Sequence, residues 1–340
     1  MKALITGGAG FIGSHLSEEL LGRGNEVAVF DDLSTGNLSN IDHLRRITGF
    51  TFHQGSVLDD MQELSSLIEH SDHIYHLAAV VGVAYVLEHP VAALETNTRG
   101  TENVLRLASQ FSDARSKKRV ILASSSEVYG KSAKVPFRED DDSVIGPTLV
   151  SRWGYACAKA LEEFVGLAYH REKGLPVVIL RLFNTVGPRQ TRRYGMVMPR
   201  LVSQAIAGEP VTVYGDGEQT RSFTYVKDVV KAIADISLVP SADGQLFNVG
   251  NNREVSINEL AELVRNVLDS PSATVHIPFS EVYGAEFEET RRRVADISKI
   301  REYISYAPTT NLAFVVKEIA DDLRTRQGEQ GVGGANERSG

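Results

Sequence analysis

The sequence predicts an α/β protein in which a Rossmann-type, doubly wound parallel sheet is joined to a smaller, mixed C-terminal lobe. Short apolar runs alternate with amphipathic helical patterns through the first half of the chain, and a glycine-rich turn follows the first apolar run. Apolar strands that alternate with helices indicate parallel βαβ units, with helices on both faces of one sheet.

Each expected element follows from its pattern of apolar residues. A strand that is buried on both faces of a sheet reads as a short apolar run. Such runs lie at 3–6, 27–30, 50–54, 73–78, 120–123, 177–180 and 247–249. Amphipathic helical patterns fill the gaps between them, at 13–21, 61–69, 98–111 and 155–170.

The regular alternation stops after Arg181. The stretch 184–193 is rich in Gly, Pro and Arg, and shorter elements follow it. A tail that is rich in glycine and lacks aromatic residues is expected to be disordered. The expected division is a dinucleotide-binding domain at 1–183 with 224–249 returning to it, a substrate-binding lobe at 184–223 and 250–325, and a disordered tail at 326–340.

The composition excludes several classes of protein. Lys and Arg number 36 and Asp and Glu number 44, so the formal net charge is −8. This balance argues against a nucleic-acid or membrane-surface partner. The chain has one cysteine, which excludes an intrachain disulfide and a cysteine-rich zinc site. The longest apolar stretch, 77–87, is too short to span a bilayer. We therefore expect a cytoplasmic protein without a metal site.

The segment 6–13, Thr-Gly-Gly-Ala-Gly-Phe-Ile-Gly, joins the first strand to the first helix. Its glycines allow a tight turn, the close approach of a pyrophosphate, and packing of the helix on the strand. The helix N-terminus adds free N–H groups and the positive end of its dipole. Asp31 and Asp32 end the second strand, where a carboxylate binds the adenosine ribose and would repel a 2′-phosphate. The pattern favours NAD over NADP.

Tyr155 and Lys159 are four residues apart in a helical stretch and therefore project from one face. A cation beside the phenol, together with a positive nicotinamide ring, would favour the phenolate, which could take a proton from a sugar hydroxyl. The segment 124–130, Ser-Ser-Ser-Glu-Val-Tyr-Gly, follows the apolar run 120–123. Ligands of open α/β sheets bind at these carboxyl ends of strands.

Taken together, these motifs resemble the extended short-chain dehydrogenases/reductases of the NAD-dependent sugar epimerase/dehydratase family, over about residues 1–325. The resemblance is closest to UDP-glucuronate 4-epimerases and UDP-glucuronate decarboxylases. Many members carry Asp where this chain has Ser56, which leaves the adenine contact there open. The matching motifs are TGGAGFIG (6–13), Asp31-Asp32, HLAA (76–79), Asn97, SSSEVYG (124–130), YACAK (155–159), RLFNTVGPR (181–189) and RSFTYVKD (221–228).

The resemblance implies a set of site residues and a homodimer formed through the helices at 98–111 and 155–170. Tyr155 would be the base, Lys159 its electrostatic partner and ribose ligand, and the further catalytic residues would be Ser125 and Glu127. The residues implied for NAD are Gly7, Gly10, Phe11, Ile12, Gly13, Asp31, Asp32, Ser34, Gly36, Ser56, Val57, Leu77, Ala78, Ala79, Asn97, Tyr155 and Lys159. Those implied for the UDP-sugar substrate are Ser125, Ser126, Asn184, Arg189, Arg192, Val213, Arg221 and Arg293.

The reaction is predicted from the arginines that follow the Asn184 motif, at positions 189, 192 and 193. A guanidinium group suits a planar sugar carboxylate, and an arginine that holds this carboxylate would suppress its loss as carbon dioxide. With Arg192 as that ligand, we expect an NAD-dependent isomerase, a UDP-glucuronate 4-epimerase that forms UDP-galacturonate through a 4-keto intermediate.

Two other reactions remain open. UDP-glucuronate decarboxylation is the alternative, because decarboxylases often carry the 124–130 segment, and UDP-glucose 4-epimerisation comes third. A protein that only binds NAD is disfavoured because such chains usually lose the tyrosine or the lysine, and this one keeps Tyr155 and Lys159.

Overall fold

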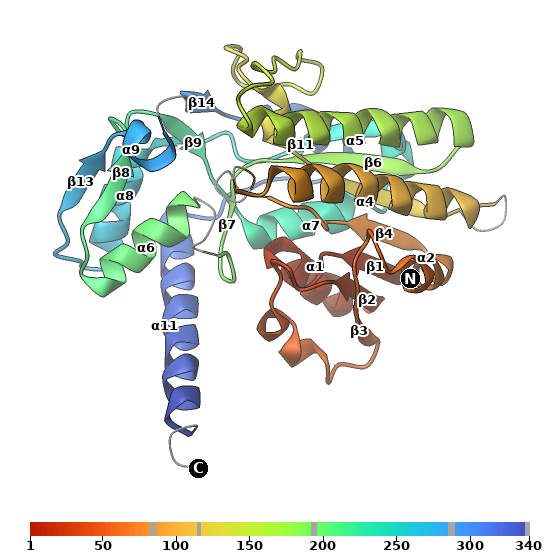
Figure 1. Ribbon diagram of the computed structural model, residues 1–340, viewed down its shortest axis with the longest axis horizontal. Coiled ribbons are helices and arrows are strands. Elements are labelled where there is room, and N and C mark those ends of the chain that lie inside the picture. Colours follow the sequence, from red (N-terminus) through yellow and green to blue (C-terminus); the bar gives the residue numbers. More distant parts are fainter. Residues whose placement is uncertain (82–85, 87, 114–116, 192–195, 285–289, 337–340) are drawn as a thin grey trace.

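A parallel sheet forms the centre of the protein (Figure 1). The structure, a computed structural model, describes residues 1–81, 86, 88–113, 117–191, 196–284 and 290–336. Within these residues the sheet has seven strands in the spatial order β11, β6, β5, β4, β1, β2, β3. All neighbouring strands run parallel, which confirms the Rossmann-type fold class. The strands are β1 (Lys2–Thr6), β2 (Glu26–Asp31), β3 (Phe50–Gln54), β4 (His73–His76), β5 (Arg119–Ser125), β6 (Val177–Leu182) and β11 (Gln245–Val249).

The apolar residues of each strand alternate between two helical layers. In β1, Ala3 and Ile5 belong to the core cluster beneath α1 (Phe11–Gly22) and α7 (Val226–Ile236). Leu4, which lies between them, belongs to the cluster on the opposite face. Full burial of such a leucine or isoleucine contributes about 1.5–3 kcal/mol each. The continuous apolar run in the sequence is therefore explained by burial on both faces.

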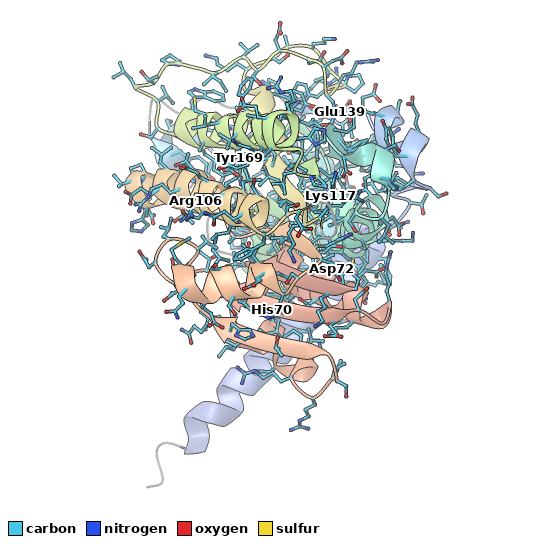
Figure 2. The ribbon with its side chains drawn as sticks, turned by 90° about the vertical axis from the view of Figure 1, so that its right-hand side faces the viewer. His70, Asp72, Arg106, Lys117, Glu139 and Tyr169 are labelled. Atoms are coloured by element: carbon cyan, nitrogen blue, oxygen red, sulfur yellow. The ribbon has the colours of Figure 1, made fainter. Side chains whose placement is uncertain are left out.

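The second layer consists of α2 (Met61–Glu69), α4 (Pro90–Gln110) and α5 (Arg152–Lys173). Figure 2 shows these helices one above another, with His70 just beyond α2, Arg106 on α4 and Tyr169 on α5. The helices α4 and α5 begin before the expected 98 and 155. At the start of α4, Pro90 has no N–H group that would need an acceptor, which favours its place in the first turn. None of the helices in the described ranges is both long and apolar enough to cross a membrane.

The smaller lobe is built from short sheets and helices (Figure 1). Ser256, just before α8 (Ile257–Val267), forms a capping box with Glu259, and Leu260 and Val264 of this helix are buried in the lobe. In the described part of the lobe, the short sheets have the strand orders β10-β7, β12-β9-β14 and β13-β8. The elements are β7 (Thr185–Val186), α6 (Val197–Ala207), β8 (Val211–Tyr214), β9 (Thr220–Ser222), β10 (Thr224–Tyr225), β12 (Glu254–Ser256), α8 (Ile257–Val267), β13 (Thr274–Ile277), α9 (Phe279–Tyr283), β14 (Arg292–Arg293), α10 (Ser298–Tyr303) and α11 (Leu312–Asn336).

The last helix, α11, differs from the tail expected from the sequence. Its first half packs against α6 and α8 with Val315, Val316 and Ile319 buried, and the helix then continues to Asn336. Figure 1 shows α11 extending away from the lobe. A packed helical segment supplies the costly nucleus, after which each added residue gains one hydrogen bond. The helix therefore runs into the 326–340 segment, for which the composition predicts disorder.

Candidate active site

A cavity of about 500 Å3 lies where the strands of the large sheet end and the smaller lobe begins. Gly7, Asp31, Leu77 and Ser125 line it from the carboxyl ends of β1, β2, β4 and β5. The smaller lobe closes it with residues that include Tyr214, Arg221 and Arg293. This is the edge at which open α/β sheets bind their ligands.

The glycine-rich turn packs closely against the neighbouring backbone only because glycines stand at key positions. Gly7 has a φ of +72°, and a Cβ there would lie 2.7 Å from the backbone nitrogen of Ala78. A Cβ on Gly13 would lie 2.3 Å from the carbonyl oxygen of Gly7. The helix α1 begins directly after Gly10 without a side-chain cap, and Phe11, like its neighbours Ile12 and Gly13, lines the cavity. This cradle fits the pyrophosphate of a dinucleotide.

Asp31 is buried at the end of β2 and organises the adjoining loop. Its carboxylate accepts hydrogen bonds from the backbone N–H groups of Ala9 at 2.9 Å and Leu33 at 2.8 Å. Burial raises the pKa of Asp31, although these two donors oppose the effect. Gly36 does not line the cavity; a Cβ there would lie 2.8 Å from Asp31 Oδ1. The exposed Asp32 and Ser34 line the same end, which fits a ribose without a 2′-phosphate.

The remaining predicted cofactor residues surround the middle of the cavity or support its wall. Leu77, Ala78, Ala79 and Val57 line it. Asn97 is buried behind the wall, where its side-chain amide accepts a hydrogen bond from Val80 N at 2.8 Å and donates one to Val80 O at 3.1 Å. Ser56 is outside the lining residues, where its backbone N–H donates to Asp60. The structure therefore makes Asn97 a support of the cavity wall rather than part of its surface.

Tyr155 and Lys159 lie on the first turns of α5 and face the cavity together with Ser125. Burial raises the pKa of Tyr155 above its usual value, and a hydrogen bond with the Ser125 side chain opposes this increase. Lys159 Nζ donates to the carbonyl oxygen of Ala123 at 3.1 Å and to Glu162 Oε2 at 3.0 Å. The phenol, the hydroxyl and the ammonium group are thus brought together as the sequence predicts.

Glu127 forms the centre of a charged cluster at the other end of the cavity. Its Oε1 lies 2.5 Å from Arg293 Nη1, and its Oε2 lies 3.3 Å from Arg152 Nη2. Burial alone would raise the pKa of Glu127, but Arg293 and Arg152 outweigh it and lower this pKa to about 2. Burial and the positive charge of Arg293 lower the pKa of Arg221 to about 9. These four side chains carry three positive charges and one carboxylate, which suits an anionic ligand.

Two further predicted substrate residues line this end of the cavity. Asn184 donates a hydrogen bond from Nδ2 to the carbonyl oxygen of Ser222 at 3.3 Å, which ties the segment after β6 to β9. Ser126 is buried beside Glu127 and also contributes to the lining.

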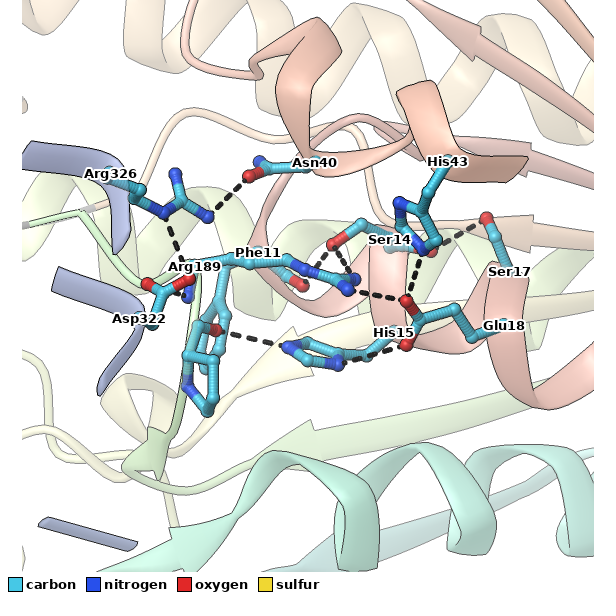
Figure 3. A network of polar contacts seen from close by, with 12 residues as sticks. Phe11, Ser14, His15, Ser17, Glu18, Asn40, His43, Arg189, Asp322 and Arg326 are labelled. Carbon is cyan, nitrogen blue, oxygen red and sulfur yellow. Dashed lines mark hydrogen bonds and ion pairs between the residues drawn. The ribbon is translucent and has the colours of Figure 1, made fainter. Parts of the chain in front are cut away.

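Arg189 is a correction to the predicted substrate contacts, because it is not among the residues that line the cavity and its guanidinium group lies against Ser14 and Glu18 (Figure 3). Its guanidinium group donates to Glu18 Oε1 at 2.5 Å and to Ser14 Oγ at 3.3 Å, both on α1. Its backbone N–H donates to Asp322 on α11 at 2.9 Å. Glu18 therefore neutralises the guanidinium charge of Arg189, which the sequence predicts to bind the substrate.

Val213 is a second correction. It is completely buried in the core of the smaller lobe, because side chains alternate along β8, and its neighbour Tyr214 lines the cavity instead. The predicted carboxylate ligand Arg192, and Arg193 beside it, lie outside the described residues.

Two charged residues that contact predicted catalytic residues are absent from the sequence-based predictions: Arg152, which pairs with Glu127, and Glu162, which pairs with Lys159. Arg152 lies three residues before Tyr155, and Glu162 lies three residues after Lys159. Residues three apart on a helix share a face, so this spacing is the signal that could have identified both.

Comparison with known proteins places the chain among nucleotide-sugar enzymes. The sequence model of a family described as GDP-mannose 4,6 dehydratase matches residues 4–319. The chain is 41% identical over 319 residues to a UDP-N-acetyl-alpha-D-glucosaminuronate decarboxylase of Bacillus cytotoxicus, covering 93% of this chain and 96% of that protein. It is 37% identical over 326 residues to UDP-glucuronic acid decarboxylase 1 of Arabidopsis thaliana, covering 96% and 70%.

A solved structure with the same fold is the UDP-glucuronic acid 4-epimerase of Bacillus cereus, in complex with UDP-glucuronic acid and NAD. The TM-score is 0.84 and the sequence identity 29%, over 96% of this chain and 99% of that chain. The family match spans both the glycine turn and the Tyr155–Lys159 pair described above. The chain therefore belongs to the GDP-mannose 4,6 dehydratase family of extended short-chain dehydrogenases/reductases.

Proposed function

We propose that the protein is an NAD-dependent decarboxylase of a UDP-linked uronic acid. The observation that carries this proposal is the ion-paired cluster of Glu127, Arg152 and Arg293 in the cavity that also holds Tyr155. Glu127 offsets part of the charge of the two arginines, and Arg189 is paired with Glu18 outside the cavity. A sugar carboxylate next to the Glu127 carboxylate would be held less firmly than by an arginine devoted to it, which favours its loss.

The two curated relatives described above support this order of preference, because both are decarboxylases of UDP-linked uronic acids by name. The proposal therefore departs from the sequence-based expectation, which places 4-epimerisation first. That expectation depends on Arg192, which lies outside the described residues, and the described arginine of the same segment, Arg189, is paired with Glu18. The proposed substrates are UDP-glucuronate and its 2-acetamido counterpart.

The residues of the chain fit the oxidation of C4 in such a sugar. The turn from Gly7 to Gly13 would hold the pyrophosphate of NAD, and Asp31 and Lys159 its ribose groups. Bound NAD would supply the chemistry of removing a hydride from C4 and returning it later. Tyr155 would take the proton of the C4 hydroxyl group, and Ser125 would hydrogen-bond the same oxygen.

Decarboxylation needs one proton besides the one that Tyr155 takes up and later returns. Oxidation makes a ketone at C4, which is β to the C6 carboxylate. The C5–C6 bond breaks, C6 leaves as carbon dioxide, and its electron pair remains on C5 in conjugation with the C4 oxygen. A proton then adds to C5, and Tyr155 returns its proton to the C4 oxygen. Each turnover therefore consumes one proton and releases one molecule of carbon dioxide and a UDP-linked pentose.

The second candidate is UDP-glucuronate 4-epimerisation, favoured by the similarity to the Bacillus cereus structure. Incubation with UDP-glucuronate and with UDP-N-acetylglucosaminuronate, followed by NMR of the products and measurement of carbon dioxide, separates the two. We expect carbon dioxide and pentose product in equal amounts. A hexuronate product inverted at C4, without carbon dioxide, would assign the protein to the epimerases instead.

We also propose a homodimer and a cytoplasmic location. The helices α4 and α5 carry large apolar side chains that are partly or largely exposed, including Val91, Leu94, Leu161 and Phe164. Pairing these helices with those of a second copy would bury this surface in a four-helix arrangement. The exposed free thiol of Cys157 on α5 is compatible with a reducing compartment.

A further inference from the structure

A buried carboxyl group lies directly behind the proposed catalytic lysine. The side chain of Glu162 is 1% exposed, and its Oε2 lies 3.0 Å from Lys159 Nζ, whose side chain is 4% exposed. The two residues are three positions apart on α5, and Lys159 lies about one turn beyond Tyr155. An ion pair in such a buried position is weakly screened, so the carboxylate strongly affects the charge that Lys159 presents to its surroundings.

Side chains of the neighbouring layer lie beside Glu162. Burial raises the pKa of Glu162, whereas Lys159 and the Thr101 side chain on α4 oppose this increase. Thr101 Oγ1 lies 3.1 Å from His76 Nε2, and His76 Nδ1 lies 2.7 Å from Thr6 Oγ1. These contacts connect Thr101 to the ends of β4 and β1, where the cavity begins. The ion pair with Lys159 Nζ orients the Glu162 carboxyl group.

The charged groups around the Tyr155 phenol come from several elements. Glu162 on α5 and Glu127 after β5 disfavour the phenolate, and Arg293 on β14 favours it. Glu163, next to Glu162 on α5, is paired with Arg181 on β6.

Two more titratable groups belong to this surrounding, His76 beside Lys159 and Arg181 beside Glu163, and neither changes charge near neutral pH. Burial and the nearby charge of Lys159 lower the pKa of His76 on β4 to about 3, so this imidazole stays neutral. Arg181 stays protonated, because its pairing with Glu163 outweighs the effect of burial. Glu162 is therefore the carboxyl group that directly pairs with Lys159 and offsets its positive charge.

We propose that Glu162 is a positioning residue that sets, through Lys159, the protonation state of Tyr155. Ionised Glu162 offsets the ammonium charge of Lys159 and thereby stabilises the protonated phenol. This inference rests on the proposed function, in which Tyr155 must return a proton to the C4 oxygen at the end of each turnover. A phenol that holds its proton too weakly would begin the oxidation readily but would complete the reduction poorly.

The first test is the pH dependence of kcat for the wild type and for Glu162→Gln, which keeps the shape of the side chain but removes the charge. We expect the acidic limb of the profile to move to lower pH by about one unit, because the phenolate becomes easier to form. The matched control is Glu172→Gln, an exposed acid at the end of the same helix, which should leave the profile unchanged. A lower rate with an unshifted profile would show a purely structural role and overturn the inference.

The second test does not depend on turnover. The phenolate absorbance of each protein is titrated against its own Tyr155→Phe counterpart, so that the difference reports Tyr155 alone. The Tyr155 phenol should ionise at lower pH in Glu162→Gln than in the wild type, and an identical titration would reject the inference. Thr101→Val removes a hydroxyl that lowers the pKa of Glu162 and that also contacts His76, and it should shift the titration in the same direction by less. If the wild type converts no UDP-uronate, the proposed function fails, whereas this titration still decides the role of Glu162.

Discussion

Glu127 Oε1 lies 2.5 Å from Arg293 Nη1, although the two residues are 166 positions apart in the chain. Glu127 follows β5 of the large sheet, and Arg293 ends β14 of the smaller lobe. Their pairing therefore joins the two parts of the protein at the cavity and lowers the pKa of the Glu127 carboxyl group.

Removing Arg293 should strongly reduce activity, because Glu127 would keep only Arg152 as a partner in a buried position. We expect Arg293→Ala to lower kcat/KM by at least about 30-fold, the usual cost of removing one member of a buried charge pair. The control is Arg292→Ala, whose exposed side chain pairs with Glu254 and should change kcat/KM by less than about threefold. Equal effects of the two substitutions would contradict the assigned role of Arg293.

Replacing Tyr155 with Phe should remove the proposed base while preserving the ring that packs in the cavity wall. We expect kcat to fall by at least about 100-fold, the usual contribution of a general base. Thermal unfolding and the content of bound NAD, measured on the same preparation, should match the wild type. A variant that keeps most of its rate would show that another group accepts the C4 proton.

Asp31→Asn should weaken the preference for NAD over NADP, because it removes the negative charge that would repel a 2′-phosphate. The substitution also weakens the hydrogen bonds from Ala9 and Leu33, so NAD affinity should fall by about tenfold. Calorimetric titration with both dinucleotides measures the two affinities. A wild type that binds NADP as tightly as NAD would refute the argument from Asp31.

Glu18 should stabilise the fold in a pH-dependent manner through its contact with Arg189. Burial would raise its pKa, but hydrogen bonds from His15 and Arg189 outweigh this and lower the pKa of Glu18 to about 2, from 4.5. A carboxyl group with a lowered pKa stabilises the folded state above its unfolded pKa and loses this contribution as pH falls. The free energy of unfolding should therefore exceed that of Glu18→Gln above pH 4.5, and the difference should shrink toward pH 2. Chemical denaturation at several pH values tests this; a constant difference would exclude the linkage.

Phe164→Glu should disrupt the proposed dimer. The Phe164 side chain is 69% exposed in the single chain, so a charge there should cost little in monomer stability. Light scattering combined with size-exclusion chromatography should show a dimer for the wild type and a monomer for the variant. Glu substituted for Leu238, an exposed apolar residue beyond α7, is the matched control and should leave the wild-type mass unchanged. A wild type that elutes as a monomer would end this proposal.

The sheet, the glycine turn and the Tyr155–Lys159 pair could all be predicted from the amino-acid sequence alone. These features depend on local physics: a strand–turn–helix unit is specified by consecutive residues, and residues four apart on a helix must share a face. Asp31 belongs to the same class, because the end of an apolar run marks the end of its strand. The glycine turn, Asp31, Tyr155 and Lys159 all line the cavity.

Which arginines line the cavity depends instead on how the elements pack together in the folded chain. Arg189 follows the sugar-lining motif in sequence, yet it pairs with Glu18 on α1, whereas Arg152 and Arg293 surround Glu127. The buried partner of Lys159, Glu162, is likewise one of two adjacent acids, and only packing directs its neighbour Glu163 to Arg181 instead. The pairing of long, charged side chains depends on which elements pack together and on the cost of burying an unpaired charge, and neither is visible from the spacing of residues along one chain.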